Sequence, residues 1–577
     1  MKFRTYPEFS SLYPLTLKTF MKRSVSLYPN EIGLVYRNPD TGQYSRFTWQ
    51  QWYQRSCQIA RVLQELGVKA GKPGQPGNRV ATMAMNHNQH LELYFAVPCI
   101  GAVLHAINMR LSLDHIVYTI NHAEDRILLF DDFSFPILEQ IYDRIRNKIE
   151  KFIYISDKPG KPETKIEPVY EYEEVLKKQP PEFEWPYLDE NTYATLCYTT
   201  GTTGTPKGVL FTHRQLYLES LNVMLRFNWN NDPAALRFDE SAVPIVSVPM
   251  YHVHAWMIPY YATYTAQKIV LPGRYTEEGF CELVEKEKVT YTAMVPTMLA
   301  MLVEYKDLKK YDMSSLKSIV CGAAVLPLGL KAKIEELIPS VIAATAGYGM
   351  TEGAPAMVGG FVKKTMKDLP KSKLDEVRVR AGLPEPGLEV EVVDDNGKPV
   401  PRDNKTTGEI VVRGPWIMEQ YYKSPDKTAE SWRDGWFHTG DVAKVDEDGY
   451  ITIADRITNV IRSGAEMIPT MLLEELTATA DFVLEATYVG VPDEKWGERP
   501  MAIIKPVSGA TPSEEDIIKF LEDEGIAKGK ITRWMLPDYI VFTDTIPRTS
   551  VGKYDKVAIK KQMDGFLTQA KRIHKRQ

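Results

Sequence analysis

Short apolar runs of strand character alternate along this 577-residue chain with longer stretches of helical periodicity. Residues 127–130 and 152–155 are such strand patterns, and the stretch between them is charged and helical. Upstream, the helical pattern of residues 52–66 ends at Gly67, which can cap it. Because this alternation is typical of helices that cross over between parallel strands, it predicts an α/β fold with largely parallel sheets.

A different pattern begins near residue 383. Residues 388–393 and 408–413 alternate with period two on either side of an Asn396-Gly397 turn, which predicts antiparallel hairpins in a small barrel-like subdomain. From residue 456 onward the pattern mixes helices and strands again. Since 577 residues exceed what one hydrophobic core usually holds, we predict an N-terminal domain of residues 1–455, with the β-rich subdomain at about 383–455, and a smaller, mobile α+β C-terminal domain of residues 456–577. The proline-rich stretch 159–186 is predicted to be a surface connection.

A threonine- and glycine-rich run lies between the β-prone segments 194–198 and 209–212, so it reads as a loop between two strands. Its glycines allow backbone N–H groups to point in one direction, and its hydroxyls and one lysine add donors and positive charge. This set suits the phosphates of a nucleoside triphosphate. The candidate residues are Thr199, Thr200, Gly201, Thr202, Thr203, Gly204 and Lys207.

Two other interpretations of this loop fit its residues less well. A Walker-type P-loop requires Gly-Lys-Ser/Thr after Gly and four residues, and that spacing is broken here. A plain surface turn rich in Gly and Thr rarely carries this spacing together with a lysine.

Two further motifs offer ligand-binding groups. In residues 347–352, Tyr348 offers a flat ring for a nucleobase, while Thr351 and Glu352 offer oxygens for a phosphate-bound Mg²⁺. Asp441 follows a tight turn and can accept hydrogen bonds from both ribose hydroxyls, and Arg456 follows one short strand later. Alone, the second pair is equally consistent with an ordinary turn acid and a surface arginine.

Together these motifs resemble the acyl- and aryl-adenylate-forming (AMP-binding) superfamily, and most closely its medium- and long-chain acyl-CoA synthetases. The resemblance extends to segments such as 121–130 and 495–500 and covers nearly the full length. It implies that Thr199 and Glu352 hold the metal and that Tyr348, between Gly347 and Gly349, stacks on adenine. It also implies that the turn Gly322-Ala323-Ala324 contacts adenine, that Asp441 grips the ribose, and that Arg456 bonds to ribose or phosphate.

The resemblance also implies roles near the reacting atoms. Residues 547–553 match the family's closing motif, whose lysine, here Lys553, reaches the α-phosphate and the acyl carboxylate during adenylation. Glu352, Thr351 and His252 complete the implied catalytic set, although a histidine between aromatic residues is often only a core residue. Trp256 corresponds to the residue that gates the fatty-acyl tunnel, and Thr458 to the hinge.

Substrate size is inferred from Gly349. Acetate-specific relatives carry a bulky Trp at the corresponding position, so a glycine is expected to open room for several methylenes, each worth about 0.8 kcal/mol when buried. We therefore expect an acid longer than acetate. Thr458 and Ala465 depart from the family pattern, which leaves the details of domain rotation and CoA entry open.

Composition limits the partners. A net charge of −5 gives no general attraction to nucleic acid, and five scattered cysteines without metal-ligand spacing indicate a reducing compartment. With no signal-peptide pattern and no apolar run of membrane-spanning length, we expect a cytoplasmic enzyme without an integral membrane segment. A homodimer is expected by analogy with the family.

The sequence thus predicts an ATP- and Mg²⁺-dependent, AMP-forming acyl-CoA synthetase, an acid-thiol ligase that joins a fatty or hydroxy aliphatic acid to CoA through an acyl-adenylate. Two alternatives stay open. One is an adenylating enzyme that passes the acyl group to a carrier protein. The other is a nucleotide-binding regulator that has lost catalysis.

Overall fold

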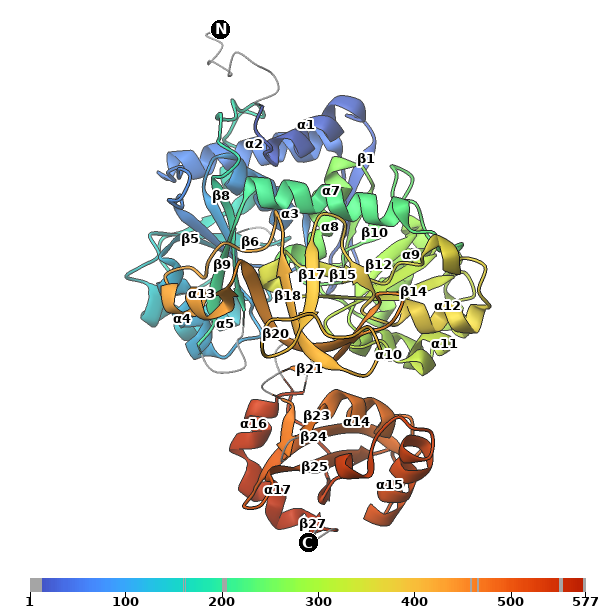
Figure 1. The fold of residues 1–577 in the computed structure, drawn as a ribbon. Coiled ribbons are helices and arrows are strands. Elements are labelled where there is room, and N and C mark those ends of the chain that lie inside the picture. The colour runs from blue at the N-terminus through green and yellow to red at the C-terminus, as the bar shows by residue number, and fades with distance from the viewer. Residues whose placement is uncertain are drawn as a thin grey trace. The chain divides into compact units, whose positions relative to one another are not determined.

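A seven-stranded sheet in the first part of the chain follows the predicted alternation (Figure 1). The computed structural model describes residues 13–158, 160, 162–199, 205–456, 459–463, 466–548 and 554–573. The strand order is β7-β6-β5-β3-β4-β8-β9. Strand β3 pairs in parallel with β4 and β5, and β5 pairs in parallel with β6, which confirms the predicted fold class. The strands are β3 (Arg79–Met83), β4 (Val103–Ala106), β5 (Asp125–Asp131), β6 (Lys151–Ile155), β7 (Val169–Glu171), β8 (Tyr193–Thr199) and β9 (Lys207–Thr212).

A nine-stranded sheet has the order β16-β15-β14-β13-β12-β10-β11-β1-β2. Its interior pairs from β14 to β1 are parallel, and the pairs at its two ends are antiparallel. The strands are β1 (Ile32–Arg37), β2 (Tyr44–Thr48), β10 (Pro244–Ile245), β11 (Ile269–Leu271), β12 (Tyr291–Met294), β13 (Ser318–Cys321), β14 (Ala343–Gly349), β15 (Ala356–Gly359) and β16 (Leu383–Pro384).

Helices connect and cover these strands, and several begin with residues whose side chains cap the helix N-terminus. Thr48 and Gln51 form a capping box at the start of α2, and Thr212 and Gln215 form another at the start of α7. Gly67 follows α2 with a φ of +80°, as its predicted capping role requires. The helices are α1 (Lys18–Leu27), α2 (Trp49–Glu65), α3 (Asn88–Cys99), α4 (Leu113–Ala123), α5 (Phe135–Ile145), α6 (Tyr172–Leu176), α7 (His213–Trp229), α8 (Ile258–Tyr264), α9 (Glu277–Glu287), α10 (Pro296–Glu304), α11 (Leu328–Leu337), α12 (Lys371–Arg378) and α13 (Pro425–Ser431).

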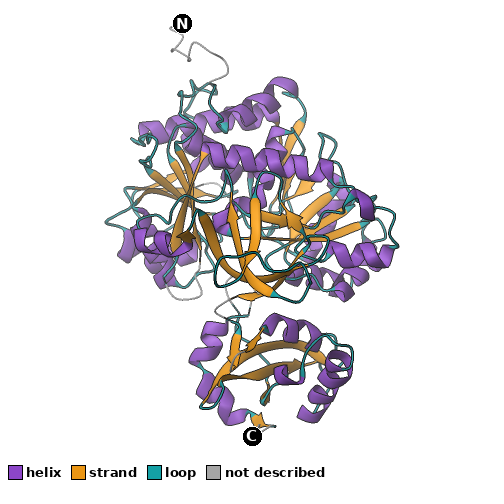
Figure 2. Ribbon diagram, in the orientation of Figure 1, coloured by secondary structure: helices purple, strands orange, loops and turns teal. Residues whose placement is uncertain are grey.

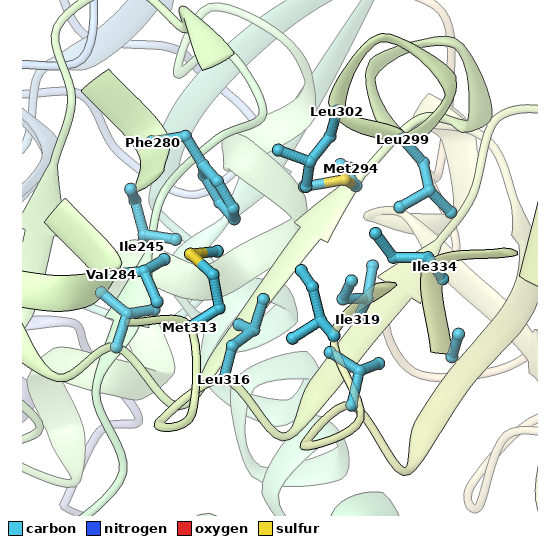
Figure 3. Close-up of a cluster of buried hydrophobic side chains, with 14 of the residues drawn as sticks. Ile245, Phe280, Val284, Met294, Leu299, Leu302, Met313, Leu316, Ile319 and Ile334 are labelled. Atoms are coloured by element: carbon cyan, nitrogen blue, oxygen red, sulfur yellow. The ribbon is translucent and has the colours of Figure 1, made fainter. Parts of the chain in front are cut away.

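The hydrophobic core of the nine-stranded sheet lies between its strands and the helices α9, α10 and α11 (Figure 3). Ile245 and Ile319 come from strands, while Phe280, Leu299 and Ile334 come from the helices, and all five are fully buried. Burying a side chain of this size is worth about 1.5–3 kcal/mol, so this layer contributes strongly to holding the sheet and its helices together.

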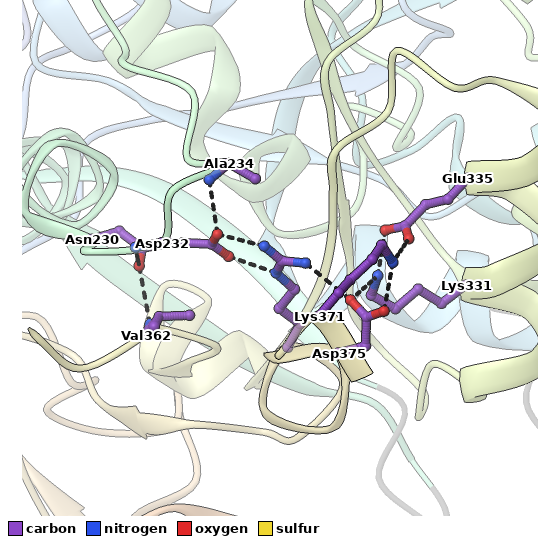
Figure 4. Close-up of polar contacts among 9 residues, drawn as sticks. Asn230, Asp232, Ala234, Lys331, Glu335, Val362, Lys371 and Asp375 are labelled. Carbon is purple, nitrogen blue, oxygen red and sulfur yellow. Dashed lines mark hydrogen bonds and ion pairs between the residues drawn. The ribbon is translucent and has the colours of Figure 1, made fainter. Parts of the chain in front are cut away.

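A buried ion-pair network ties α11 and α12 to the segment that follows α7 (Figure 4). The Arg378 guanidinium donates two hydrogen bonds to Asp232, at 2.5 and 2.6 Å, and a third to Asp375 at 2.9 Å. Lys331 reaches the same Asp375 at 2.7 Å. Because Asp232 and Arg378 are both buried, each charge depends on the other for its stability.

The chain forms two compact units: Met1–Glu389 with Val412–Phe437, and Val390–Val411 with His438–Gln577. The predicted β-rich subdomain is a five-stranded sheet in which β17, β18, β20 and β19 are neighbours and β21 pairs with β20 (Figure 2). The predicted turn is present, since the Gly397 N–H bonds to the Asp394 carbonyl at 2.9 Å. The division at residues 455 and 456 stays a prediction. The strands are β17 (Glu389–Val393), β18 (Thr407–Arg413), β19 (Trp432–Arg433), β20 (Trp436–Val445) and β21 (Ile451–Arg456).

The remainder of the second unit mixes helices with a six-stranded sheet, as predicted for its α+β character. Strands β24 and β25 form a long antiparallel pair, and β26 joins β25 in parallel. The elements are β22 (Ile461–Ser463), β23 (Glu466–Ile468), α14 (Thr470–Thr477), β24 (Val483–Asp493), β25 (Gly497–Pro506), α15 (Glu514–Phe520), β26 (Tyr539–Phe542), α16 (Lys556–Lys561), α17 (Met563–Gln569) and β27 (Lys571–Arg572).

The predicted surface connection at residues 159–186 is wrong in part. It contains β7, which pairs with β6, and α6, which begins at Tyr172 and has Glu171 as its N-cap. Tyr172 is fully buried there and donates a hydrogen bond to the buried Glu92 at 2.7 Å. These long-range contacts, rather than local periodicity, create the two elements. No helix in the described ranges is both long and apolar enough to span a membrane.

Candidate functional site

The predicted phosphate loop connects the two strands of a hairpin. Strands β8 and β9 are antiparallel, and Thr199 lies directly opposite Lys207 where the pairing ends. This confirms the prediction of a loop between two strands. Its central residues, Thr200, Gly201, Thr202, Thr203 and Gly204, lie outside the described residues.

Glu352 lies next to this hairpin in the first unit. It belongs to the 3₁₀ turn η4 (Thr351–Gly353), which packs against β8. Its carboxylate is only 4% exposed and accepts a 2.8 Å hydrogen bond from the Tyr421 hydroxyl. The Tyr421 ring in turn faces the Lys207 ammonium, 4.3 Å from the ring centroid. The fold therefore brings together the lysine of one predicted motif and the carboxylate of another.

Tyr421 was not predicted as a site residue. It lies in the segment between β18 and α13, outside every motif, and the adjacent Met418 N–H donates to the Glu352 carbonyl at 2.8 Å. The isolated bridge between Val209 and Tyr421 brings this segment alongside β9. Only the tertiary structure identifies Tyr421, because the aromatic pair Tyr421-Tyr422 has no distinguishing local pattern.

The nucleobase candidate Tyr348 lies on β14, opposite Val358 of β15. The structure gives a different reason for glycine at the neighbouring position 349. A Cβ atom on Gly349 would overlap the carbonyl of Pro355, so this position requires glycine because another backbone segment approaches it. The structure thus gives no support to the inference that Gly349 opens room for the acyl chain.

The turn predicted to contact adenine lies against Trp256, a residue predicted to line the acyl pocket. Gly322 follows β13 and lies against the Trp256 indole, where an added Cβ would come within 2.9 Å of the ring. Ala323 adopts a left-handed φ of +67°, and Ala324 continues the turn. Trp256 itself lies in η2 (Val253–Met257), a turn whose five residues all have positive φ. Such backbone is strained for residues other than glycine and is concentrated at functional sites.

The two histidines of this region differ in their surroundings. His254 is fully buried, and its Nε2 lies 2.7 Å from the Thr195 hydroxyl and 3.5 Å from the Cys197 sulfur. Burial lowers its pKa to about 3, so it remains neutral and is a core histidine. The candidate His252 is only half-buried, which leaves it accessible for a role toward the substrate.

In the second unit, the two ribose candidates are neighbours. Asp441 of β20 lies opposite Arg456 of β21, and the Arg456 Nε lies 2.9 Å from the Asp441 carboxylate. Asp441 is 4% exposed, so the arginine compensates a buried charge. Lys553 and Thr458 lie outside the described residues, so their roles remain predictions.

Two protein-family models match the chain: AMP-binding enzyme over residues 21–422, and AMP-binding enzyme C-terminal domain over residues 472–553. The chain belongs to the AMP-binding enzyme family. The long-chain-fatty-acid–CoA ligase of Thermus thermophilus is 38% identical, across 96% of this chain and 96% of that protein. The 4-hydroxybutyrate–CoA ligase 2 of Metallosphaera sedula is 32% identical, across 95% of this chain and 94% of its own length.

A solved family structure shares the fold. The crystal structure of an anthranilate CoA ligase bound to anthranoyl-AMP matches with a TM-score of 0.79 at 21% identity, covering 95% of this chain and 97% of that one. The named relatives are CoA ligases, which are acid-thiol ligases of this family, so the predicted resemblance and enzyme class are confirmed.

Proposed function

We propose that this chain is an ATP-dependent, AMP-forming acyl-CoA synthetase acting on an aliphatic carboxylic acid longer than acetate. The observation that carries this proposal is the group Lys207, Tyr421 and Glu352. Within the first unit, the Tyr421 ring contacts the Lys207 ammonium and its hydroxyl donates to the Glu352 carboxylate, so one tyrosine joins groups from two separate motifs. The relatives that act on long-chain fatty acids and on 4-hydroxybutyrate support a fatty or hydroxy acid as substrate.

The proposed nucleotide-binding roles fall on residues from several motifs. Thr199 and Lys207 face the phosphates, Tyr348 stacks on adenine beside the Gly322 turn, and Asp441 with Arg456 receives the ribose. Thr351 and Glu352 contribute further oxygens on the phosphate side. Each assignment extends a family role to a residue whose surroundings are compatible with it.

The residues also fit a magnesium ion. The Thr199 hydroxyl and the Glu352 carboxylate are hard oxygen ligands of the kind that Mg²⁺ prefers, and η4, which holds Glu352, packs against β8, which ends at Thr199. Bound there, Mg²⁺ would neutralise charge on the phosphates. The hydrogen bond from Tyr421 keeps the Glu352 carboxylate oriented.

The reaction would proceed in two halves. The substrate carboxylate attacks the α-phosphorus of ATP, the bond to the β-phosphate oxygen breaks, and pyrophosphate leaves. Lys553 would stabilise the negative charge that accumulates at the α-phosphate, and His252 would lie by the carboxylate. The CoA thiol then attacks the acyl carbon of the adenylate, and AMP departs with the bonding electron pair.

The remaining expectations belong to this proposal. They are a division at residues 455 and 456 with a hinge at Thr458, a homodimer, and a cytoplasmic location. Light scattering of the purified chain tests the dimer directly, and a single-chain mass would contradict it.

The assay is direct. The purified chain is mixed with ATP, Mg²⁺, CoA and a panel of linear acids from acetate upward, and both pyrophosphate and thioester are measured. We expect both products, with a maximum above acetate. Release of pyrophosphate without thioester would favour transfer of the acyl group to a carrier protein. ATP binding without turnover of any acid would reject the proposal that the chain is an enzyme.

A further inference from the structure

The last turn of helix α4 contacts the hairpin that carries the predicted phosphate loop. The Nδ1 of His122 in this turn lies 2.7 Å from the hydroxyl of Tyr198 in β8. Tyr198 immediately precedes Thr199, where the pairing of β8 with β9 ends. A histidine 76 positions away in the sequence therefore contacts the base of the loop, although it belongs to none of the motifs.

Tyr198 is in contact with both strands of this hairpin. It lies opposite Gly208 of β9, and a Cβ atom added at Gly208 would come within 3.1 Å of the Tyr198 ring. The ring thus packs directly on the β9 backbone, next to Lys207 at the start of that strand. Since Thr199 and Lys207 flank the loop, the position of this one ring is coupled to the backbone at both ends of the loop.

Three tyrosine rings surround the His122 imidazole. Tyr118, one turn earlier in α4, stacks on it with ring centroids 5.2 Å apart, and Tyr422 meets it edge-on at 5.6 Å. The Tyr198 ring is the third, with centroids 5.8 Å apart. Packing against three rings restricts the imidazole to one orientation, so Nδ1 stays directed toward the Tyr198 hydroxyl.

His122 also contacts the segment between β18 and α13. The Lys423 ammonium donates to the His122 carbonyl at 3.2 Å, and the Tyr422 N–H donates to the Gly208 carbonyl at 2.8 Å. The preceding residue is Tyr421, which joins the two charged groups of the candidate site. The end of α4 therefore packs against both the hairpin and the segment that holds the lysine of that hairpin.

The hydrogen bond between the two side chains has one direction near neutral pH. Burial raises the pKa of the Tyr198 phenol far above its usual value, and the charge of Asp125 raises it further, so the phenol keeps its proton. Burial also lowers the pKa of His122, and the nearby Lys423 lowers it further. Among the described residues the phenol has no other hydrogen-bond partner, so its O–H donates to the neutral Nδ1.

We propose that His122 is a positioning residue for ATP: by holding the Tyr198 hydroxyl, it fixes the hairpin from whose ends Thr199 and Lys207 reach the phosphates. This inference rests on the proposed function and adds a residue to the same site. His122 acts through Tyr198 and not by contact with the nucleotide. Its effect follows because binding groups must be held to within about 0.5 Å by packed and hydrogen-bonded neighbours.

The test removes the hydrogen bond from each side in the full chain. Tyr198→Phe deletes only the hydroxyl, and His122→Phe keeps a ring among the tyrosines but lacks the acceptor. Each is expected to weaken ATP binding, measured by calorimetry without any acid, by about five- to tenfold, the effect of one buried hydrogen bond. The KM for ATP in pyrophosphate release should rise by the same factor, while the KM for the acid stays unchanged.

Further variants separate positioning from plain packing. His122→Asn is expected to keep ATP binding near that of the wild-type chain, because Asn Oδ1 and His Nδ1 are both two bonds from Cβ and both accept. The double variant of Tyr198→Phe with His122→Phe should bind ATP no more weakly than the weaker single variant, since both changes remove one interaction. His115→Phe, at a half-buried position of the same helix, is the matched control.

The outcomes distinguish this inference from the proposed function. Unchanged ATP binding in Tyr198→Phe would overturn the inference, even if His122→Phe does not fold. Equal losses in His122→Asn and His122→Phe would also overturn it, because the acceptor would then have no part in the effect. Absence of pyrophosphate release with every acid would reject the proposed function, while the calorimetry would still decide the role of His122. Absence of ATP binding by the wild-type chain would overturn both.

Discussion

At the scale of single residues, the candidate site depends on side chains that share partners. Tyr421 contacts Lys207 through its ring and Glu352 through its hydroxyl, so one side chain positions both charges. Within the proposed reaction these charges face the phosphates and the metal. Removing only the hydroxyl separates the two roles of Tyr421.

Tyr421→Phe is expected to lower kcat/KM for pyrophosphate release on the order of tenfold, because a hydrogen bond to a charged group is worth about 1.5–3 kcal/mol. The ring over Lys207 remains, so the KM for ATP should change less than kcat. Steady-state kinetics measure both. Tyr422→Phe, at the adjacent buried tyrosine, is the control, and an equal loss in both variants would contradict this assignment.

The buried histidines predict how stability depends on pH. Burial lowers the pKa of His90 and His254 to about 3 and that of His213 to about 4. Below pH 6.5 the unfolded chain binds protons at these histidines that the folded chain does not bind. Stability is therefore fully present above about pH 6.5 and falls as the pH drops toward 4.

Each histidine contributes about a tenfold change in the folding equilibrium constant per pH unit within that window. His254→Gln removes one of the three, so its stability should fall less steeply with acidification than that of the wild-type chain. Urea unfolding at a series of pH values from 4 to 8 measures the slope. His115→Gln serves as a control at a half-buried position, and equal slopes for His254→Gln and the wild type would exclude His254 as a contributor.

At the scale of elements, charged networks as well as apolar layers decide how helices are held. Helix α12 is tied to the segment after α7 through Arg378 and Asp232, and to α11 through Asp375 and Lys331 (Figure 4). Asp232 and Arg378 are 1% and 4% exposed, so neither charge is stabilised by water. Breaking this pair from one side leaves a buried charge alone.

Arg378→Met is expected to lower the free energy of unfolding by about 3–5 kcal/mol, because Asp232 then remains buried and ionised without its partner. Asp232→Asn in the same chain should restore part of that loss. A double-mutant cycle in urea measures the coupling. Additive effects of the two changes would show that the pair is not coupled, contrary to this expectation.

At the scale of the whole molecule, the candidate groups are divided between two units. Lys207, Glu352 and Tyr421 belong to the first unit, while Asp441 and Arg456 belong to the second. Position 553 also falls within the residue range of the second unit. In the proposed reaction, the first half needs Lys553, and the attack of CoA on a finished adenylate does not.

Lys553→Ala is therefore expected to reduce pyrophosphate exchange by several hundredfold, in line with the loss of a group that stabilises transition-state charge. Conversion of added acyl-adenylate to thioester should continue at a similar rate. Lys560→Ala, on the exposed face of α16, is the control. Equal losses in both half-reactions would place Lys553 outside the adenylation step.

Local pattern was sufficient for the loop between β8 and β9, the parallel core of the sheets and the capped helix α2, because hydrophobic periodicity and end-capping act between residues close in the chain. It was not sufficient for β7 and α6, which exist through pairing with β6 and burial of Tyr172. Nor could local pattern reveal that a Cβ at Gly349 would meet the Pro355 carbonyl, because that contact comes from the neighbouring strand.

The amino-acid sequence by itself thus determined the family motifs and the kinds of chemical group at the site, since these depend on residue type and short spacing. Only the tertiary structure decided that Tyr421 joins Lys207 to Glu352. The physical reason is that burial and hydrogen-bond partners arise between segments distant in the chain, where no local pattern records them.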